Sequence, residues 1–521
     1  MNWQTFFLFL TPTCFSLSTA LAESAAPGST KLSKVLSSFM QHEDGAFRYQ
    51  LLSQEEDPAR SLNVETYQMD SQKWPVFEDA DIPTTVWSHR LRLFIPRGTR
   101  NANVLLYVGG GYNRDKEGKT ESFDAPKEQL DYALIASVTQ SVVAELQDVP
   151  NQFLYMNGEW KREDQFMAFT YKKVMQNPLK NAFLAGHLPM AKSIVKAMDL
   201  IQTRMREVSK DQDTRFVLAG ASKRGWAVWL AALEDPRVDA IIPIVIDVLN
   251  VQKSMNHICV RYKGCPYSFK DYEAENLTHK LNSQAFADLM KIEDPFQYLG
   301  LDYDAKYKER MSIPKMIINA SGDDFFVPDS SHWYFKALPG SQNYIRYMPN
   351  ALHYFRGNPI SDATQSLAMI QQSVLSFFAL HGKGVSLPKV EWDLKPDVIE
   401  VRSSVLPSRI RLWTAFNEEA PDFRYINKHS SWHFLKKKLM SYFPSIFGEL
   451  CDTCYKSQDL SILSDSKNGL VYEVKLPIRP GTWRASFVEL HYQVADHEFI
   501  VTSEVSLGFT GNAAEGKDLR R

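Results

Sequence analysis

Between residues 103 and about 355, short apolar runs alternate with amphipathic stretches, and this alternation restricts the possible folds more than any other feature. The runs lie at 103–111, 141–147, 215–220, 240–247, 314–324 and 344–349. Stretches with helical periodicity separate several of them, such as PMAKSIVKAMDLIQTRMREV at 189–208. Strands that alternate with helices form βαβ units, in which helices cover both faces of a parallel sheet. The sequence therefore predicts an α/β fold with a doubly wound, mostly parallel sheet.

Two stretches inside this region, 148–188 and 248–312, are too long for simple crossover connections. Both are rich in aromatic and polar residues. Insertions of this size at one edge of a sheet commonly fold over the functional site. We therefore expect a capping insertion. Before the alternating region, residues 46–97 contain shorter segments such as VWSHRLRLFIP, which predict antiparallel strands.

After about residue 385 the strand–helix alternation stops. Segments such as VIEVRSSVLP, RIRLWTAF, LVYEVKLP and SFVELHYQVAD have period-two patterns separated by turn residues. This spacing predicts a C-terminal all-β, sandwich-like domain. The predicted organisation is an α/β domain at 23–384, a β-domain at 385–510 and a flexible tail at 511–521.

Residues 1–22, MNWQTFFLFLTPTCFSLSTALA, have the features of a targeting segment. They carry no charged side chain, include the apolar block Phe6–Leu10, and end in Ala20-Leu21-Ala22. This pattern predicts a signal peptide, with Glu23 as the first mature residue. A buried N-terminal strand is the alternative. Export would make the protein secreted or periplasmic.

The charge balance excludes several classes of partner. The chain has 59 Lys and Arg and 61 Asp and Glu, for a formal net charge of −2. We expect no binding to nucleic acid or to an anionic membrane surface. No internal run reaches the 18 or more apolar residues of a membrane-spanning helix, so we expect no membrane span.

The five cysteines fall into a clear pattern. Cys14 lies in the predicted signal peptide, which leaves the pairs Cys259/Cys265 and Cys451/Cys454. Two close pairs in an exported protein predict two short-loop disulfides. The alternative is a four-thiolate zinc site, although only the second pair has C-x-x-C spacing. We expect no metal and no cofactor.

The stretch FVLAGASKRGWAV at 216–228 predicts a strand, a tight turn and a helix, with Ser222 in the turn. A serine in this position can act as a nucleophile if an imidazole takes its proton, a carboxylate holds the imidazole and N–H groups stabilise the oxyanion. The usual pattern is G-x-S-x-G. Here Arg224 takes the last position and Gly225 follows it. An ordinary turn made of small residues is the alternative interpretation.

Candidate acids follow the serine in the order expected for α/β-hydrolases, which is Ser, then Asp or Glu, then His. Asp324 follows the run PKMIINA, in the segment SGDDFFVPD. We take Asp324 as the acid, while its neighbours Asp323 and Asp329 remain alternatives. Asp247, which ends the strand candidate IIPIVID, is a further competitor. A solvated Gly-Asp-Asp turn would be the structural alternative.

The remaining parts also occur at the ends of predicted strands. His353 follows the last strand candidate, in the segment MPNALH. The run GGGYN after NVLLYV supplies candidate oxyanion N–H groups at Gly110, Gly111 and Tyr112, and Lys223 supplies another. A nucleotide-binding loop is excluded because neither glycine-rich nucleotide motif is present.

Several longer stretches resemble one protein family. They include AGASKRGWAVWLAA, DPRVDAIIPIVIDVLN, PKMIINASGDDFFVPDSSHWYF, LPGSQNYIRYMPNALH, LWTAFNEEAPDFR and PGTWRASFVELHY, and together they span about residues 45 to 500. The chain resembles the PhoPQ-activated pathogenicity-related proteins, a group that includes the autocrine proliferation repressor proteins of amoebae. The resemblance implies an exported α/β-hydrolase with a C-terminal β-domain, tied to virulence or to secreted growth regulation. It also implies that Arg224 is a regular part of the motif, and it carries the acid and base over to Asp324 and His353. Leu352 departs from the family, in which a small residue often precedes the histidine.

Two functions follow from this sequence. The first is a serine hydrolase that acts on an ester or amide of a small molecule or peptide. The second is a secreted signalling or binding protein on a hydrolase scaffold, which would contact a protein or carbohydrate partner through its β-domain. Glycosylation of the sequon at Asn276 is left open, and a second sequon at Asn319 falls in a predicted buried strand.

Overall fold

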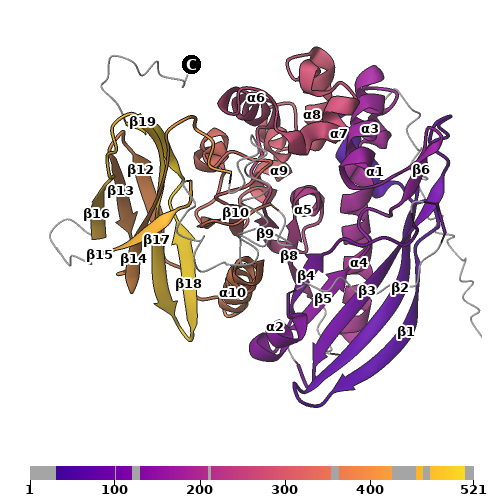
Figure 1. Cartoon of the computed structure of the whole chain (residues 1–521). Helices are drawn as coiled ribbons and strands as arrows, with labels where there is room; N and C mark the ends of the chain where they lie inside the picture. Colours follow the sequence, from indigo (N-terminus) through magenta and orange to yellow (C-terminus); the bar gives the residue numbers. More distant parts are fainter. Residues whose placement is uncertain are drawn as a thin grey trace, which may run out of the picture.

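The structure is a computed structural model that describes residues 31–99, 101–115, 117–119, 130–208, 213–353, 363–424, 453–461 and 470–510. Its largest element is a nine-stranded sheet with the order β1-β2-β3-β5-β4-β8-β9-β10-β11 (Figure 1). The strands are β1 (Arg48–Asp57), β2 (Leu62–Trp74), β3 (Thr85–Pro96), β4 (Asn103–Val108), β5 (Val142–Leu146), β8 (Arg215–Ala221), β9 (Val238–Ile244), β10 (Lys315–Ala320) and β11 (Asn343–Met348). The strands from β5 to β11 in this order pair in parallel, and β1, β2, β3 and β5 pair antiparallel. The predicted α/β fold is confirmed.

Helices cover the sheet on both sides. Figure 1 shows α4 (His187–Val208) and α5 (Lys223–Glu234) on one side of the central strands, and α2 (Tyr132–Thr139) and α10 (Ala363–Gly382) on the other. The central strands are buried on both faces, which explains why they appear in the sequence as continuous apolar runs.

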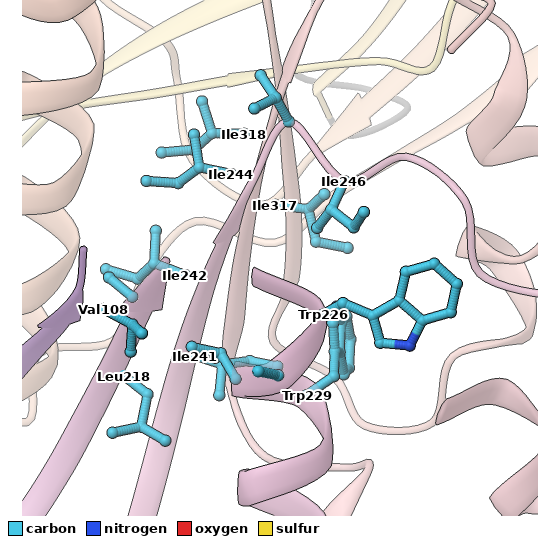
Figure 2. Packing of buried hydrophobic residues seen from close by; sticks show 14 of the residues in the cluster. Val108, Leu218, Trp226, Trp229, Ile241, Ile242, Ile244, Ile246, Ile317 and Ile318 are labelled. Carbon is cyan, nitrogen blue, oxygen red and sulfur yellow. The ribbon is translucent and has the colours of Figure 1, made fainter. Parts of the chain in front are cut away.

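Side chains of the central strands form the core between the helices. Figure 2 shows Ile241, Ile242 and Ile244 of β9 and Ile317 and Ile318 of β10. Ile317 lies on the side of the tryptophans of α5, whereas Ile242, Ile244 and Ile318 lie on the opposite face of the strands. All five isoleucines are at most 1% exposed. Burial of each contributes about 1.5–3 kcal/mol. This core fixes the strand ends at which the candidate site is built.

The two long insertions form a cap of helices and one hairpin. The first contains the hairpin β6 (Leu154–Met156) and β7 (Glu159–Lys161), followed by α3 (Glu163–Gln176). The second contains α6 (Val251–Arg261), α7 (Lys270–Ala274), α8 (Gln284–Glu293) and α9 (Lys306–Arg310). Helix α3 contacts both α7 and α8, so the two insertions pack on each other. The remaining helices are α1 (Val35–Gln41) and the short 3-10 helices η1 (Leu32–Lys34), η2 (Ala182–Leu184), η3 (Tyr267–Phe269), η4 (Thr278–Lys280), η5 (Pro295–Leu299), η6 (Ser330–Trp333) and η7 (Phe335–Ala337).

Beyond α10 the described residues form additional β-sheets, as the period-two segments predict. One sheet has the order β12-β13-β16, and another has the order β15-β14-β17-β18 with β19 paired to β17. The strands are β12 (Val390–Leu394), β13 (Val398–Ser403), β14 (Arg409–Asn417), β15 (Lys456–Leu460), β16 (Leu470–Lys475), β17 (Thr482–Val494), β18 (His497–Thr502) and β19 (Ser506–Thr510). Strand β18 contacts β11 and α10, and the Tyr347 N–H donates to Thr502 Oγ1 over 3.0 Å. The C-terminal sheets therefore pack against the β11 edge of the central sheet.

Two sequence expectations concern single features of the fold. In the part of the chain that the structure describes, no helix is long and apolar enough to cross a membrane. The sequon residue Asn319 lies in β10 and is 1% exposed, as predicted. The predicted signal peptide and C-terminal tail lie outside the described residues.

Candidate active site

Ser222 lies in a sharp turn between β8 and α5. Its backbone has φ +58° and ψ −132°, a region that a residue with a side chain rarely adopts. Such a conformation costs about 1–3 kcal/mol and persists only where the surrounding structure enforces it. Two backbone hydrogen bonds hold this conformation. The Ser222 N–H donates to Ile244 O over 2.8 Å, and Ser222 O accepts from the Trp226 N–H over 3.1 Å. The turn holds the hydroxyl at the C-terminal end of the sheet.

Gly225 occupies the closest contact in this turn. A Cβ on Gly225 would lie 2.6 Å from Gly220 O and 3.0 Å from the side chain of Ile246. A Cβ on Gly220 would lie 3.0 Å from the backbone of Arg224. The late glycine of the motif is therefore needed where helix α5 crosses strand β8, and the turn remains intact with Arg224 in the usual glycine position.

His353 links Ser222 to a carboxylate. Its Nε2 lies 2.9 Å from Ser222 Oγ, and its Nδ1 lies 2.9 Å from Asp323 Oδ2. Both His353 and Asp323 are buried. The sequence pointed to Asp324 as the acid. The structure corrects this choice, because the carboxylate that is hydrogen-bonded to His353 Nδ1 belongs to Asp323. The distance between Ser222 and His353 agrees with the sequence prediction for that pair.

The loop after β10 explains why the first aspartate faces the histidine. Asp323 Oδ1 accepts from the backbone N–H groups of Phe325 and Phe326, over 2.7 and 3.2 Å, which leaves Oδ2 for His353. The backbone carbonyl of Asp324 accepts a hydrogen bond from the Ser268 hydroxyl, which ties the loop to the cap. Two further bonds tie this loop to the histidine loop, one from the Gly322 N–H to Ala351 O and one from the Asn350 N–H to Ser321 Oγ.

The surroundings of His353 favour its protonated form. Burial lowers the pKa of His353, but the charge and hydrogen bond of Asp323, with a smaller contribution from Asp324, outweigh burial and raise it overall. Lys223 acts weakly in the opposite direction. An imidazolium formed when His353 takes a proton would therefore be stabilised where it forms.

The two other candidate acids have different partners. Asp329 accepts from His257 and Arg261, which hold the pKa of its carboxyl below the usual range despite burial. Asp247 is hydrogen-bonded to two tyrosine hydroxyls, those of Tyr334 and Tyr347, each over 2.6 Å. Burial raises the pKa of Asp247 to about 8. Each of these carboxylates is thus engaged in a separate buried cluster.

The side chains of Lys223 and Arg224 are held by one carboxylate from the cap. Glu163, the first residue of α3, accepts from Lys223 Nζ over 2.8 Å and from Arg224 Nη2 over 2.6 Å. Burial opposes ionisation of Glu163, but the two cations hold its pKa well below the usual range. Arg224 Nε also donates to Val149 O. The sequence offered no signal for Glu163, which lies some sixty residues before its partners in the chain.

The glycine run lies beside the serine turn, as the oxyanion prediction requires. Strands β4 and β8 are parallel neighbours in which Val108 pairs with Gly220, so the loops that follow them meet at one edge. A Cβ on Gly110 would lie 2.6 Å from Arg224 Nη2, and one on Gly111, which has φ +137°, would lie 2.3 Å from Asp148 Oδ1. Gly111 thus requires glycine, and a side chain at Gly110 would displace the Arg224 guanidinium. Whether Gly110, Gly111, Tyr112 and Lys223 donate to an oxyanion remains a prediction.

The cysteines have the oxidised state expected of an exported protein. Cys259 and Cys265 form a disulfide that closes the loop after α6, as predicted. Cys454 is also disulfide-bonded. Its predicted partner Cys451 lies outside the described residues, so that pairing stays a prediction. The described His, Cys, Asp and Glu side chains form no group of three or more that could hold a metal ion.

Comparison with known proteins relates the chain to a family. A family model for the "PhoPQ-activated pathogenicity-related protein" matches residues 36–424. The chain is also similar to autocrine proliferation repressor protein A of Dictyostelium discoideum, with 29% identity over 461 residues that cover 86% of this chain and 83% of the relative.

Solved structures that resemble the chain include esterases and a peptidase. Acetyl xylan esterase 1 of a Thermoanaerobacterium species aligns with a TM-score of 0.41 and 12% identity over 69% of this chain and 95% of its own. A glucuronoyl esterase of Solibacter usitatus aligns with a TM-score of 0.35 and 13% identity over 66% and 92%. The acylaminoacyl peptidase of Pyrococcus horikoshii aligns with a TM-score of 0.37 and 11% identity over 66% and 51%.

Proposed function

Because the chain belongs to the family of PhoPQ-activated pathogenicity-related proteins and has an α/β-hydrolase fold, we propose that it is an exported serine hydrolase. It would cleave an ester or amide through a triad of Ser222, His353 and Asp323. The proposal rests on one observation. His353 Nε2 lies 2.9 Å from the Ser222 hydroxyl, and His353 Nδ1 lies 2.9 Å from the Asp323 carboxylate. The disulfide after α6 supports the proposal of export, since such bonds persist in oxidising compartments.

The geometry allows the following reaction. Ser222 Oγ attacks the carbonyl carbon while His353 Nε2 takes its proton, and Asp323 stabilises the resulting imidazolium. The oxyanion accepts from the N–H of Lys223 and from the glycine loop. Collapse of the tetrahedral intermediate expels the alcohol or amine, which takes the proton from Nε2. Water then hydrolyses the acyl-enzyme with His353 again acting as the base.

Hydrolysis of model substrates tests the proposal. We expect the purified mature chain with intact disulfides to hydrolyse 4-nitrophenyl acetate or a peptidyl 4-nitroanilide, and Ser222→Ala and His353→Ala to lose the activity. His332→Ala is the matched control, because this exposed histidine follows the same loop but lies outside the proposed triad. Activity that survives Ser222→Ala would contradict the proposal.

The second candidate function is a secreted signalling or binding protein on a hydrolase scaffold. The similarity to a protein named as a proliferation repressor favours it. If this function holds, Ser222→Ala would keep the full biological effect of the secreted protein, and wild-type protein would show no hydrolysis of either substrate.

A further inference from the structure

The glycine loop after β4 turns three successive carbonyl groups to one side. Gly109 O and Gly110 O accept hydrogen bonds from backbone N–H groups of the segment 148–152, which follows β5. Gly111 O accepts from the side chain of Gln152, whose Nε2 lies 2.6 Å away. All three carbonyls of the loop therefore face the β5 side of β4.

The N–H groups of the same loop point the other way. Its peptide bonds are trans, so each N–H is directed opposite to the carbonyl that precedes it. The sheet order β5-β4-β8 places Ser222, which follows β8, on the side of β4 opposite to β5 (Figure 1). The N–H groups of Gly110, Gly111 and Tyr112 are thus turned toward the serine turn. Among the described residues, those of Gly110 and Gly111 have no hydrogen-bond acceptor.

Gln152 is fixed in the one orientation that lets it donate to this loop. It is 2% exposed, and its Nε2 donates both to Gly111 O and, over 2.8 Å, to Glu163 Oε1. Its Oε1 accepts from the Glu163 N–H over 2.9 Å. A flipped amide would set Oε1 against two acceptors, so the bonds to Glu163 determine which end of the amide faces the loop. The backbone carbonyl of Gln152 also accepts from the Asn113 N–H, just beyond the loop.

Glu163 is in turn held by the serine turn. Its carboxylate accepts from Lys223 and Arg224, the two residues that follow Ser222. Its backbone φ of +44°, at the start of α3, is rarely adopted by a residue with a side chain and persists where surrounding contacts enforce it. The Arg224 guanidinium also lies against Gly110. These contacts form a closed ring, from the serine turn through the cap to the glycine loop and back.

From this ring of contacts we propose that Gln152 and Glu163 are positioning residues for the oxyanion site. Gln152 holds the peptide between Gly111 and Tyr112 with its N–H toward Ser222, and Glu163 holds Gln152. The inference rests on the proposed hydrolase function, in which these N–H groups stabilise the oxyanion on the attacked carbonyl. Both side chains act through the backbone of the loop. The first capping insertion thereby contributes to catalysis by setting the direction of N–H groups.

Replacement of Gln152 by Met tests the proposal, because it removes the donated hydrogen bonds and keeps a side chain of similar length. Acylation and deacylation both pass through an oxyanion, so we expect kcat and kcat/KM for 4-nitrophenyl acetate to fall about 10- to 100-fold. The rate constant for labelling by a fluorophosphonate probe should fall by a similar factor. The acidic limb of the kcat/KM profile should stay at the wild-type pH, since the bonds of His353 are untouched.

Gln72→Met is the matched control. Gln72 is also buried and donates two hydrogen bonds through Nε2, but it lies on β2, which β3 and β5 separate from β4. This variant should leave the catalytic and labelling rate constants unchanged, whatever its effect on stability. Partial unfolding lowers the amount of labelled protein, whereas the rate constant is read from the fraction that labels. A partly unfolded variant therefore still decides the question.

Gln152→Glu is the second variant at the same position. It keeps the acceptor for the Glu163 N–H but sets a carboxylate oxygen against Gly111 O, so it should lose at least as much activity as Gln152→Met.

Glu163→Ala tests whether the cap acts through Gln152. We expect a loss of the same kind in kcat and in the labelling rate constant. The double variant with Gln152→Met should lose no more than the larger single loss, because both changes break one chain of bonds. Losses that multiply in the double variant would overturn the role of Glu163.

The remaining outcomes separate this inference from the function on which it rests. If wild type is active and both Gln152 variants keep its rate constants, the inference is overturned while the triad stands. A loss that comes with a shift of the acidic limb would assign Gln152 to the support of His353, and would overturn its role at the oxyanion. If wild type neither hydrolyses the ester nor reacts with the probe, the proposed function fails, and the inference fails with it.

Discussion

Replacement of Asp247 by Asn tests the electrostatic account of the buried region beneath the site. Asp247 lies in a chain of hydrogen bonds with Tyr334, Tyr347 and Ser331. The Tyr347 hydroxyl lies 2.9 Å from Ser331 Oγ and 2.6 Å from Asp247 Oδ2, but it has only one hydrogen to donate. When Tyr347 donates to Ser331, Asp247 must supply the hydrogen to Tyr347. A protonated, neutral Asp247 can donate this hydrogen. An asparagine at this position can form the same two hydrogen bonds, because its Nδ2 can donate to Tyr347 while its Oδ1 accepts from Tyr334.

The expected magnitude follows from the pKa of Asp247, which rises from an ordinary 3.8 to about 8 because of burial. A carboxyl with a raised folded pKa contributes its full stability below the unfolded pKa and loses it as pH rises toward the folded value. Between about pH 4 and pH 8 the loss is about 1.4 kcal/mol per pH unit. We therefore expect Asp247→Asn to match wild type near pH 4 and to be more stable by about 4 kcal/mol at pH 7.

Urea unfolding of both proteins at pH 5, 6 and 7 measures this effect, because other titrating groups cancel in the difference. The advantage of Asp247→Asn should grow by about 3 kcal/mol from pH 5 to pH 7. Asp302→Asn, at an exposed aspartate, is the matched control and should show no such trend. A variant whose advantage is independent of pH, or which is less stable than wild type at pH 7, would refute the reasoning.

Two further predictions concern the site itself. Asp323→Asn should lower kcat by about 10⁴-fold, and it should move the acidic limb of the kcat/KM profile to lower pH, because the carboxylate that raises the pKa of His353 is gone. Asp324→Asn should change kcat by less than about tenfold, since it loses a charge but no hydrogen bond to Nδ1; equal losses in both variants would contradict the assignment. Gly225→Ala should lower the free energy of unfolding by about 1–3 kcal/mol because its Cβ would meet a carbonyl at 2.6 Å. Gly508→Ala is the control, because a Cβ there meets nothing within 4 Å, and it should leave the free energy of unfolding nearly unchanged. Equal urea midpoints for the two variants would show that the contact between residue 225 and Gly220 O is not tight.

The parts of the fold that depend on local periodicity were predictable from the sequence. The central strands are buried on both faces, so their apolar runs identify them, and the order of the chain then brings Ser222 and His353 to the same edge of the sheet. Gly220 and Gly225 were also predictable, because a helix that crosses a strand at short range leaves no room for a Cβ at the crossing point.

The features that the sequence left undecided depend on irregular backbone and on distant contacts. Asp323 and Asp324 are adjacent and chemically alike, and only the bonds from two following N–H groups turn the first one toward His353. The partner of Arg224 lies at the start of a capping helix, and no local pattern connects Glu163 to the serine turn.

Covalent labelling with a fluorophosphonate probe tests the central claim most directly. The probe reacts with a serine only where a base activates the hydroxyl and N–H groups hold the oxyanion. We predict one adduct per chain on the folded, disulfide-intact protein, located by peptide mass spectrometry at Ser222 and absent from Ser222→Ala and His353→Ala. An unlabelled wild-type protein, or an adduct on another serine that persists in Ser222→Ala, would contradict the account.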